Sequence, residues 1–406
     1  MQAKEKRASQ HPGTPTEVLA VALRLGLTSF GGAIAHFGYF RREYVERRRW
    51  LDEATFADLL ALAQSLPGPA SSQLGMAIGY RRAGLGGALA AWFGFTLPSA
   101  VILIGFATAT TSVDLAHAGW VHGLRLAAVA VVAGAVVAMW RALAPDLSRT
   151  VLALAAAALI LLWVSPFAQP AAIVIGAIVG RAFFAGDAPA PAPATADARS
   201  GRFPGGRRSM IALALFVALL VGLPLLRLAT NAPVVATADA FYRSGSLVFG
   251  GGHVVLPLLH TTVVDPGWVS EDRFLAGYGL TQAMPGPLFT FAGYLGATSS
   301  LPPAGVAGGI IAIVAVFLPS FLLLVGLLPA WETVRGWPLA RSALVGVNAA
   351  VVGLLAAALV TPVITTTIVT PLDATIAAVG AVSLVVGRIP PWAVVAGAAV
   401  LGQLAG

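Results

Sequence analysis

The 406-residue sequence contains no cysteine, and only 10% of its residues are charged. Without cysteine the chain has no disulfide bond, no thiolate metal ligand and no thiol nucleophile. A soluble globular surface needs about 25% charged residues, so this composition excludes one. The apolar segments also lack paired acids and His/Asp groups with metal-ligand spacing. The sequence therefore predicts no enzyme, no metal site and no cofactor.

Apolar residues take the place of the missing charge: they make up 58% of the chain, and the mean hydropathy is +0.85. This predicts an all-α polytopic membrane protein with about 13 membrane segments in the lipid bilayer. Lys and Arg outnumber Asp and Glu by 25 to 17, but they lie in short loops between apolar runs. That placement indicates a positive-inside topology rather than nucleic-acid binding. The start of the chain lacks the pattern of a cleaved signal peptide.

Two stretches, Gln64 to Pro69 and Gln282 to Pro287, each place a glycine between two prolines inside apolar sequence. Proline lacks a backbone N–H and clashes with the preceding turn, so a continuous helix is excluded at both. An unpaired backbone group costs several kcal/mol in lipid, and such breaks persist only where they line a cavity or a packed interior. The alternative is a proline kink that only shapes a helix.

Four motifs recur in the same order, which indicates two copies of about 170 residues each. Phe30 and Phe249 are 219 positions apart, Trp50 and Trp268 are 218 apart, Pro67 and Pro285 are 218 apart, and Pro98 and Pro319 are 221 apart. We expect a first repeat over 1–185, a Pro/Ala/Arg-rich linker over 186–208, an additional transmembrane helix over 209–228 and a second repeat over 229–406.

The additional helix 209–228 predicts an inverted-topology duplicated repeat, because each copy has an even number of crossings and one extra crossing reverses the second copy. Loop charge favours discontinuous or re-entrant helices, since the basic loop at 41–49 then lies in the cytoplasm and the acidic loop at 265–272 lies outside. Inverted repeats with broken helices at matching positions are a transporter architecture, with the binding site near the midplane.

Such a site suits an anion, because half-helices that begin after each break offer free N–H groups and a positive dipole end. Arginines inside apolar segments could face the anion, or they could snorkel to the headgroups or pair with an acid. His36 and His253 could be structural or could carry protons. The predicted substrate-binding residues are Arg24, Gly31, Gly32, His36, Gln64, Pro67, Gly68, Pro69, Ser71, Ser72, Arg125, Arg243, Gly250, Gly251, His253, Gln282, Pro285, Gly286, Pro287 and Thr290.

These motifs together resemble the chromate ion transporter family in its long, two-domain form. The matching stretches are Ser29 to Gly32 with His36, Trp50-Leu51, Gln64 to Gln73, Gly94 to Ser99, Phe249 to His253, Gly267-Trp268, Phe274 to Gly279 and Gln282 to Phe291. The resemblance implies efflux of chromate across the inner (plasma) membrane of a bacterium, which gives chromate resistance, with sulfate as a competing oxyanion.

The sequence departs from the family pattern at Ala33, often Pro, at Ala63, often Cys, and at Thr262, where an acid is common. These departures leave the coupling ion and the substrate preference open. The alternative function is transport of another anion, such as sulfate or a small carboxylate. A membrane-embedded enzyme and a structural membrane protein fit the duplicated breaks less well. A monomer and a homodimer both stay open.

The inverted repeat predicts that the loops before the two Pro-Gly-Pro stretches lie on opposite sides of the membrane. In this cysteine-free chain, Val45→Cys should react with an impermeant maleimide from the cytoplasmic side and Gly267→Cys from the outside. Labelling of both positions from the same side would refute the inversion.

Overall fold

The computed structural model describes residues 13–110, 118–163, 165, 167–184, 206–249, 252–331 and 337–405. In its first half lie α2 (Pro15–Thr28), α3 (Gly32–Phe40), the π-helix η1 (Arg41–Arg47), α4 (Glu53–Ser65), α5 (Ala70–Ala109), α6 (Gly119–Leu143), α7 (Leu147–Leu162) and α8 (Ala168–Phe183). The predicted linker lies outside the described residues as far as residue 205.

The helix α10 (Arg207–Thr230) follows, where the additional helix was predicted. The second half holds α11 (Pro233–Leu247), η2 (Gly252–Val254), α12 (Val255–Val263), α13 (Glu271–Ala283), η3 (Leu288–Thr290), α14 (Phe291–Thr298), α15 (Gly305–Leu327), η4 (Leu328–Ala330), α17 (Pro338–Ala358), η5 (Leu359–Ile364), α18 (Thr365–Thr367), α19 (Pro371–Val385) and α20 (Pro391–Ala405). Within the described ranges no strand is present.

Five helical stretches in the described residues are long and apolar enough to cross a membrane, and they lie at 70–109, 119–143, 207–230, 305–330 and 341–367. Of these, α10 is the least covered by the rest of the protein, with 6% of its most apolar window buried. An apolar helix exposed to this extent is stable only against lipid. The prediction of an all-helical membrane protein is confirmed, whereas the count of about 13 segments and the inverted repeat stay predictions.

Both Pro-Gly-Pro stretches interrupt helices, as predicted. Between α4 and α5 the chain leaves the helical conformation, and Gly68 adopts a left-handed φ of +119°. Between α13 and η3, Gly286 has a φ of +97°. The helix is also broken at Phe30-Gly31-Gly32, which we call the first glycine motif; the second is Phe249 to Gly252. Here α2 ends at Thr28 and α3 begins after Gly31, whose φ is +96°. In the second half, α11 ends at Leu247 and the described residue Val248 after it is extended.

The interruptions of the two halves are joined by two backbone hydrogen bonds with matching positions. Gly68 donates its N–H to the carbonyl of Val248 at 2.7 Å, and Gly286 donates its N–H to the carbonyl of Ser29 at 2.9 Å. Each acceptor directly precedes the glycine motif of the other half, and the two acceptors are 219 positions apart in the sequence. These bonds satisfy backbone groups that the breaks would otherwise leave unpaired in the interior.

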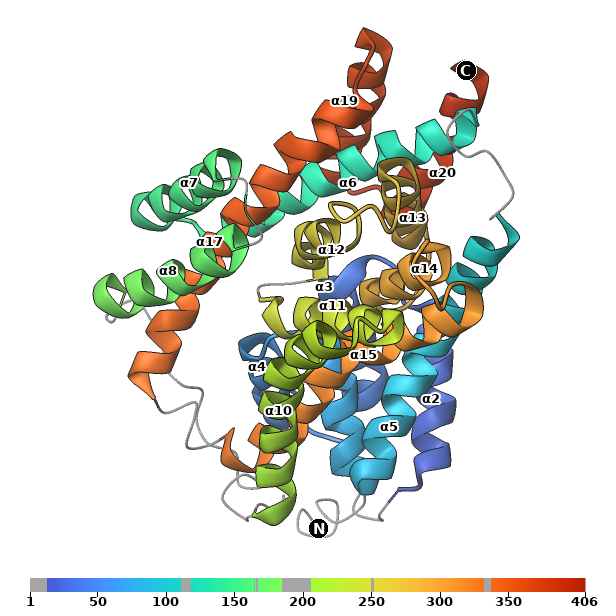
Figure 1. Ribbon diagram of the computed structural model, residues 1–406. Helices are drawn as coiled ribbons and strands as arrows, with labels where there is room; N and C mark the ends of the chain where they lie inside the picture. Colours follow the sequence, from blue (N-terminus) through green and yellow to red (C-terminus); the bar gives the residue numbers. More distant parts are fainter. Residues whose placement is uncertain are drawn as a thin grey trace.

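The long helices also pack across the two halves. α6 packs against α19 and α20 of the second half, while α17 packs against α7 and α8 of the first half. In Figure 1, α7, α8 and α17 lie together on one side, and α6, α19 and α20 lie together at the top. Gly346 of α17 allows close approach to Gly176 and Gly180 of α8, as small residues do between helices in lipid.

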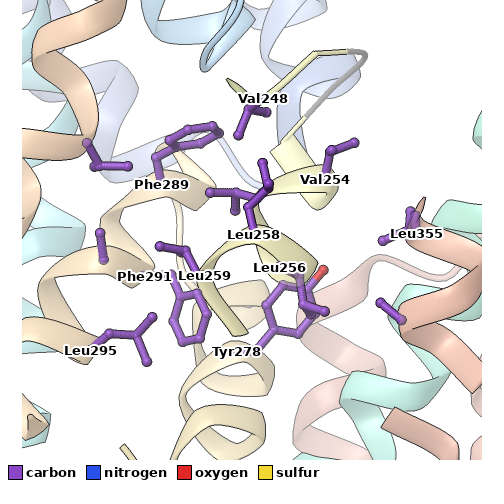
Figure 2. Close-up of a cluster of buried hydrophobic side chains, with 14 of the residues drawn as sticks. Val248, Val254, Leu256, Leu258, Leu259, Tyr278, Phe289, Phe291, Leu295 and Leu355 are labelled. Carbon is purple, nitrogen blue, oxygen red and sulfur yellow. The ribbon is translucent and has the colours of Figure 1, made fainter. Parts of the chain in front are cut away.

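The interrupted helices of the second half are embedded in a large apolar cluster. Figure 2 shows this cluster around α12, with Phe289 and Phe291 on one side and Leu355 of α17 on the other. Tyr278 of α13 lies in the same cluster and is fully buried. Dense packing of this kind holds the backbone breaks in one conformation.

Gly68 lies so close to the other half of the protein that there is no room for a side chain at this position. A Cβ atom there would lie 1.9 Å from Oγ of Ser320, and the φ of +119° is strained for other residues. We expect Gly68→Ala to lower the free energy of unfolding in detergent by roughly 2–4 kcal/mol.

The matched control is Gly222→Ala in α10, where an added Cβ meets nothing within 4 Å. This substitution should leave stability unchanged or raise it. Equal unfolding midpoints for Gly68→Ala and the parent protein would contradict the importance of this contact.

Candidate functional site

A cavity of about 390 Å³ lies where the interrupted helices of both halves meet. The first half contributes the start of α3, the end of α4, the start of α5 and the second half of α6. The second half of the chain contributes η2, the end of α13, the start of η3 and one residue of α17. The cavity thus forms at the place that the sequence singled out.

Four helical segments begin at this cavity. Gly32 and Ala70 are the first residues of α3 and α5. Gly252 and Leu288 are the first residues of η2 and η3, three-residue 3-10 turns that continue into α12 and α14, and all four residues line the cavity. The first N–H groups of a helix have no partner within the helix, and the helix dipole adds a positive potential at that end. Four such ends around one cavity, two from each half, favour a negatively charged ligand.

Several carbonyl groups beside the cavity are already occupied by hydrogen bonds. The carbonyl of Ser29 accepts from the N–H of Gly286 at 2.9 Å and from Nε2 of His36 at 3.2 Å. The carbonyl of Pro67 accepts from Nε2 of Gln73 at 2.7 Å. These bonds engage backbone oxygens that would repel an anion, while the helix starts remain available.

Polar side chains in the cavity have unused hydrogen-bonding groups. Gln64 is exposed and lines the cavity, although Leu62 and Ala63 before it in α4 are buried. Nε2 of Gln282 and Nδ1 of His36 are buried and have no protein partner. Nδ1 of His253 lies 2.8 Å from the hydroxyl of Tyr278, which also hydrogen-bonds Gln282. Buried polar atoms without a partner are costly and mark a place where a ligand can supply the missing bond.

Half of the predicted site residues line the cavity, namely Gly31, Gly32, His36, Gln64, Gly68, Pro69, Ser71, His253, Gln282 and Gly286. Eight others do not line it, namely Arg24, Pro67, Ser72, Arg125, Arg243, Pro285, Pro287 and Thr290. Gly250 and Gly251 lie outside the described residues. The residues from the four motifs are therefore brought together, whereas the arginines are not.

The arginines that were expected to face an anion have other surroundings. Arg125 forms an ion pair with Asp272 at 2.6 Å and donates to the carbonyl of Thr366 at 2.6 Å. Arg243 pairs at 2.6 Å with Asp239, whose side chain is 1% exposed. Arg24 lies on the exposed face of α2. The lining residues in the described part of the chain include neither Lys or Arg nor Asp or Glu.

Sequence reasoning missed the wall that α6 and α17 provide. Small and apolar residues of α6 line the cavity from Ala135 to Leu143, and Asn348 of α17 joins them. The α6 residues carry no signal, because alanine is common throughout the apolar segments. Asn348 could have been found from the sequence, because its amide lies within an apolar helix and polar residues inside membrane helices are costly and often functional.

Interrupted helices around a cavity with several polar lining residues, in a chain with several membrane helices, define a membrane transporter. The sequence model of the chromate transporter family matches residues 16–181 and 235–403. The chain belongs to the chromate transporter family, as the resemblance in the motifs predicted. The members of this family are transporters and not enzymes.

Several curated relatives share most of the chain. A probable chromate transport protein of Synechococcus elongatus is 28% identical over 83% of this chain and 82% of its own length. The chromate transport protein of Pseudomonas aeruginosa is 28% identical over 85% of this chain and 80% of its own length. An uncharacterized transporter of Methanocaldococcus jannaschii is 25% identical over 87% of this chain and 86% of its own length. No solved structure matches the chain significantly.

The ion pair of Arg243 predicts a structural role for this residue. Arg243→Ala removes the nearer of the two arginines that pair with buried Asp239, the other being Arg227 at 3.3 Å. We expect this substitution to lower the free energy of unfolding by roughly 1–3 kcal/mol. The anion affinity of the protein that remains folded should not change.

Arg24 supplies the matched control, because it lies 219 positions before Arg243 and is exposed. Arg24→Ala should change stability by less than about 0.5 kcal/mol, as is usual at exposed positions. If Arg243→Ala unfolds like the parent protein but no longer binds the anion, the structural role is wrong.

Proposed function

We propose that this protein binds chromate in the cavity and carries it out of the cytoplasm across a bacterial inner membrane. The observation that carries the proposal is the convergence of four helix starts on one cavity, in a chain of the chromate transporter family. Relatives named as chromate transport proteins support the choice of substrate.

A tetrahedral oxyanion matches the groups that this cavity offers. Its oxygens accept hydrogen bonds from the N–H groups at the helix starts and from the amides of Gln64 and Gln282. Ser71 and His253 are further lining residues that can donate. Hydrogen bonds to a charged group contribute about 1.5–3 kcal/mol each, so a few of them suffice for binding without an arginine.

We further propose that the two matched segments are copies of opposite orientation. The single helix α10 between them supplies the odd crossing, and the paired bonds of Gly68 and Gly286 relate the same positions in both copies. In this arrangement the cavity lies near the middle of the membrane, as in other transporters with inverted repeats.

The reach of the cavity along α6 and the charge of chromate support the proposed direction of transport. The lining residues continue along α6 to Leu143, past exposed Arg141, and basic residues mark the cytoplasmic side. These features support a cavity that opens towards the cytoplasm. Each negative charge that leaves an inside-negative cell gains about 2.3 kcal/mol per 100 mV, and a dianion gains about twice that. The membrane potential alone can drive the export.

Sulfate has the same shape and charge as chromate and fits the same donors. It is therefore the expected competitor. The groups that line the cavity favour a tetrahedral anion in general, and a flat carboxylate would use fewer of them.

The direct test is transport into inside-out membrane vesicles. Respiring vesicles that contain the protein should accumulate chromate, excess sulfate should reduce the accumulation, and an ionophore that collapses the membrane potential should abolish it. The double variant Gln64→Leu, Gln282→Leu should bind chromate roughly 100- to 10,000-fold more weakly, since two donors are lost.

Met284→Leu is the control, because Met284 lines the same cavity without a strong hydrogen-bonding group. If chromate accumulates only in right-side-out vesicles, the protein imports chromate and the proposed export is wrong. The absence of chromate transport in both orientations would refute the proposed function.

A further inference from the structure

The wall that α6 and α17 give to the cavity is apolar except at one position. On α6 the lining residues are Ala135, Ala138, Met139, Ala142 and Leu143, and on α17 the lining residue is Asn348. In the described chain, Asn348 is thus the one lining residue of these two helices with a side chain that forms strong hydrogen bonds.

The side chain of Asn348 is half-buried, and no hydrogen bond to another described residue occupies its amide. Its neighbours on α17, Ala349 and Ala350, are fully buried. A polar amide in an apolar membrane helix destabilises the fold unless it finds a partner. The unoccupied amide of Asn348 is thus available to a ligand in the cavity, which can replace water there.

Packing alone does not require an amide at this place. Position 129 of α6 lies 219 residues before Asn348, and it carries a valine that is 4% exposed. α6 and α17 begin at Gly119 and Pro338, which are also 219 positions apart. An apolar residue thus serves at the matching position of the other half, where the cavity is not reached.

We propose that Asn348 coordinates the transported oxyanion by donating a hydrogen bond from its side-chain amide. This inference rests on the proposed function and adds a residue to its site. The other polar side chains that line the cavity belong to α3, α4, α5, η2 and α13. Asn348 is the group that ties the bound anion to the α6 and α17 wall, so the anion contacts both parts of the molecule at once.

The experiment measures chromate and sulfate binding to the purified full-length protein by titration calorimetry. Asn348→Ala should weaken the binding of both anions by roughly 10- to 100-fold, as expected for one lost hydrogen bond to a charged group. Asn348→Asp keeps the shape but adds a negative charge, and it should abolish measurable binding. Asn348→Gln keeps the donor and should bind more tightly than Asn348→Ala.

Asn348→Val introduces the residue found at the matching position 129, which packs well in α6, so this variant should fold. It should bind the anions as weakly as Asn348→Ala. Val137 of the same helix α6 is exposed and does not line the cavity, so Val137→Leu should bind like the parent protein.

Parent-like affinity of folded Asn348→Ala and Asn348→Val overturns the role of Asn348 and leaves the proposed function intact. A parent protein that binds neither chromate nor sulfate overturns both.

Discussion

The structure depends on two reciprocal hydrogen bonds, from Gly68 to Val248 and from Gly286 to Ser29. A helix broken by two prolines exposes backbone groups that cannot remain unpaired in a membrane interior. Here each Pro-Gly-Pro break is bonded to the residue before the Phe-Gly-Gly stretch of the other half. Glycine is required at both positions, because φ is positive and a side chain would collide with Ser320 or Ser99 of the opposite half. The cavity exists because the two breaks are held next to each other.

This arrangement explains how a site without arginine can suit an anion. The carbonyls of Ser29, Pro67 and Val248 are engaged by hydrogen bonds, while four helix starts point their positive ends at the cavity. Charge compensation then comes from many weak dipoles instead of one strong cation. A site of this kind holds its anion less firmly than an arginine pair would. Moderate affinity suits a transporter, which must also release what it binds.

The sequence predicted the breaks correctly because proline and glycine act locally: the positions of Gly31, Gly68 and Gly286 follow from the chain itself. Ten of the twenty predicted site residues line the cavity, all of them in the recurring glycine and Pro-Gly-Pro motifs or within a few residues of them. The partners of Arg125 and Arg243 could not be predicted in the same way. Asp272 is far from Arg125 in the sequence, and the two residues meet only because α6 of the first half packs against α13 of the second half. Packing between helices of the two halves also places α6 and Asn348 at the cavity.

The central claim is that chromate binds in the cavity between the two breaks. Chromium scatters X-rays anomalously, so diffraction above its absorption edge on crystals grown with chromate locates the anion directly. The account predicts one strong chromium peak inside the cavity, within hydrogen-bonding distance of Gln64, Gln282 or the first N–H groups of α5. A peak beside Arg24, Arg125 or Arg243, with an empty cavity, would contradict it.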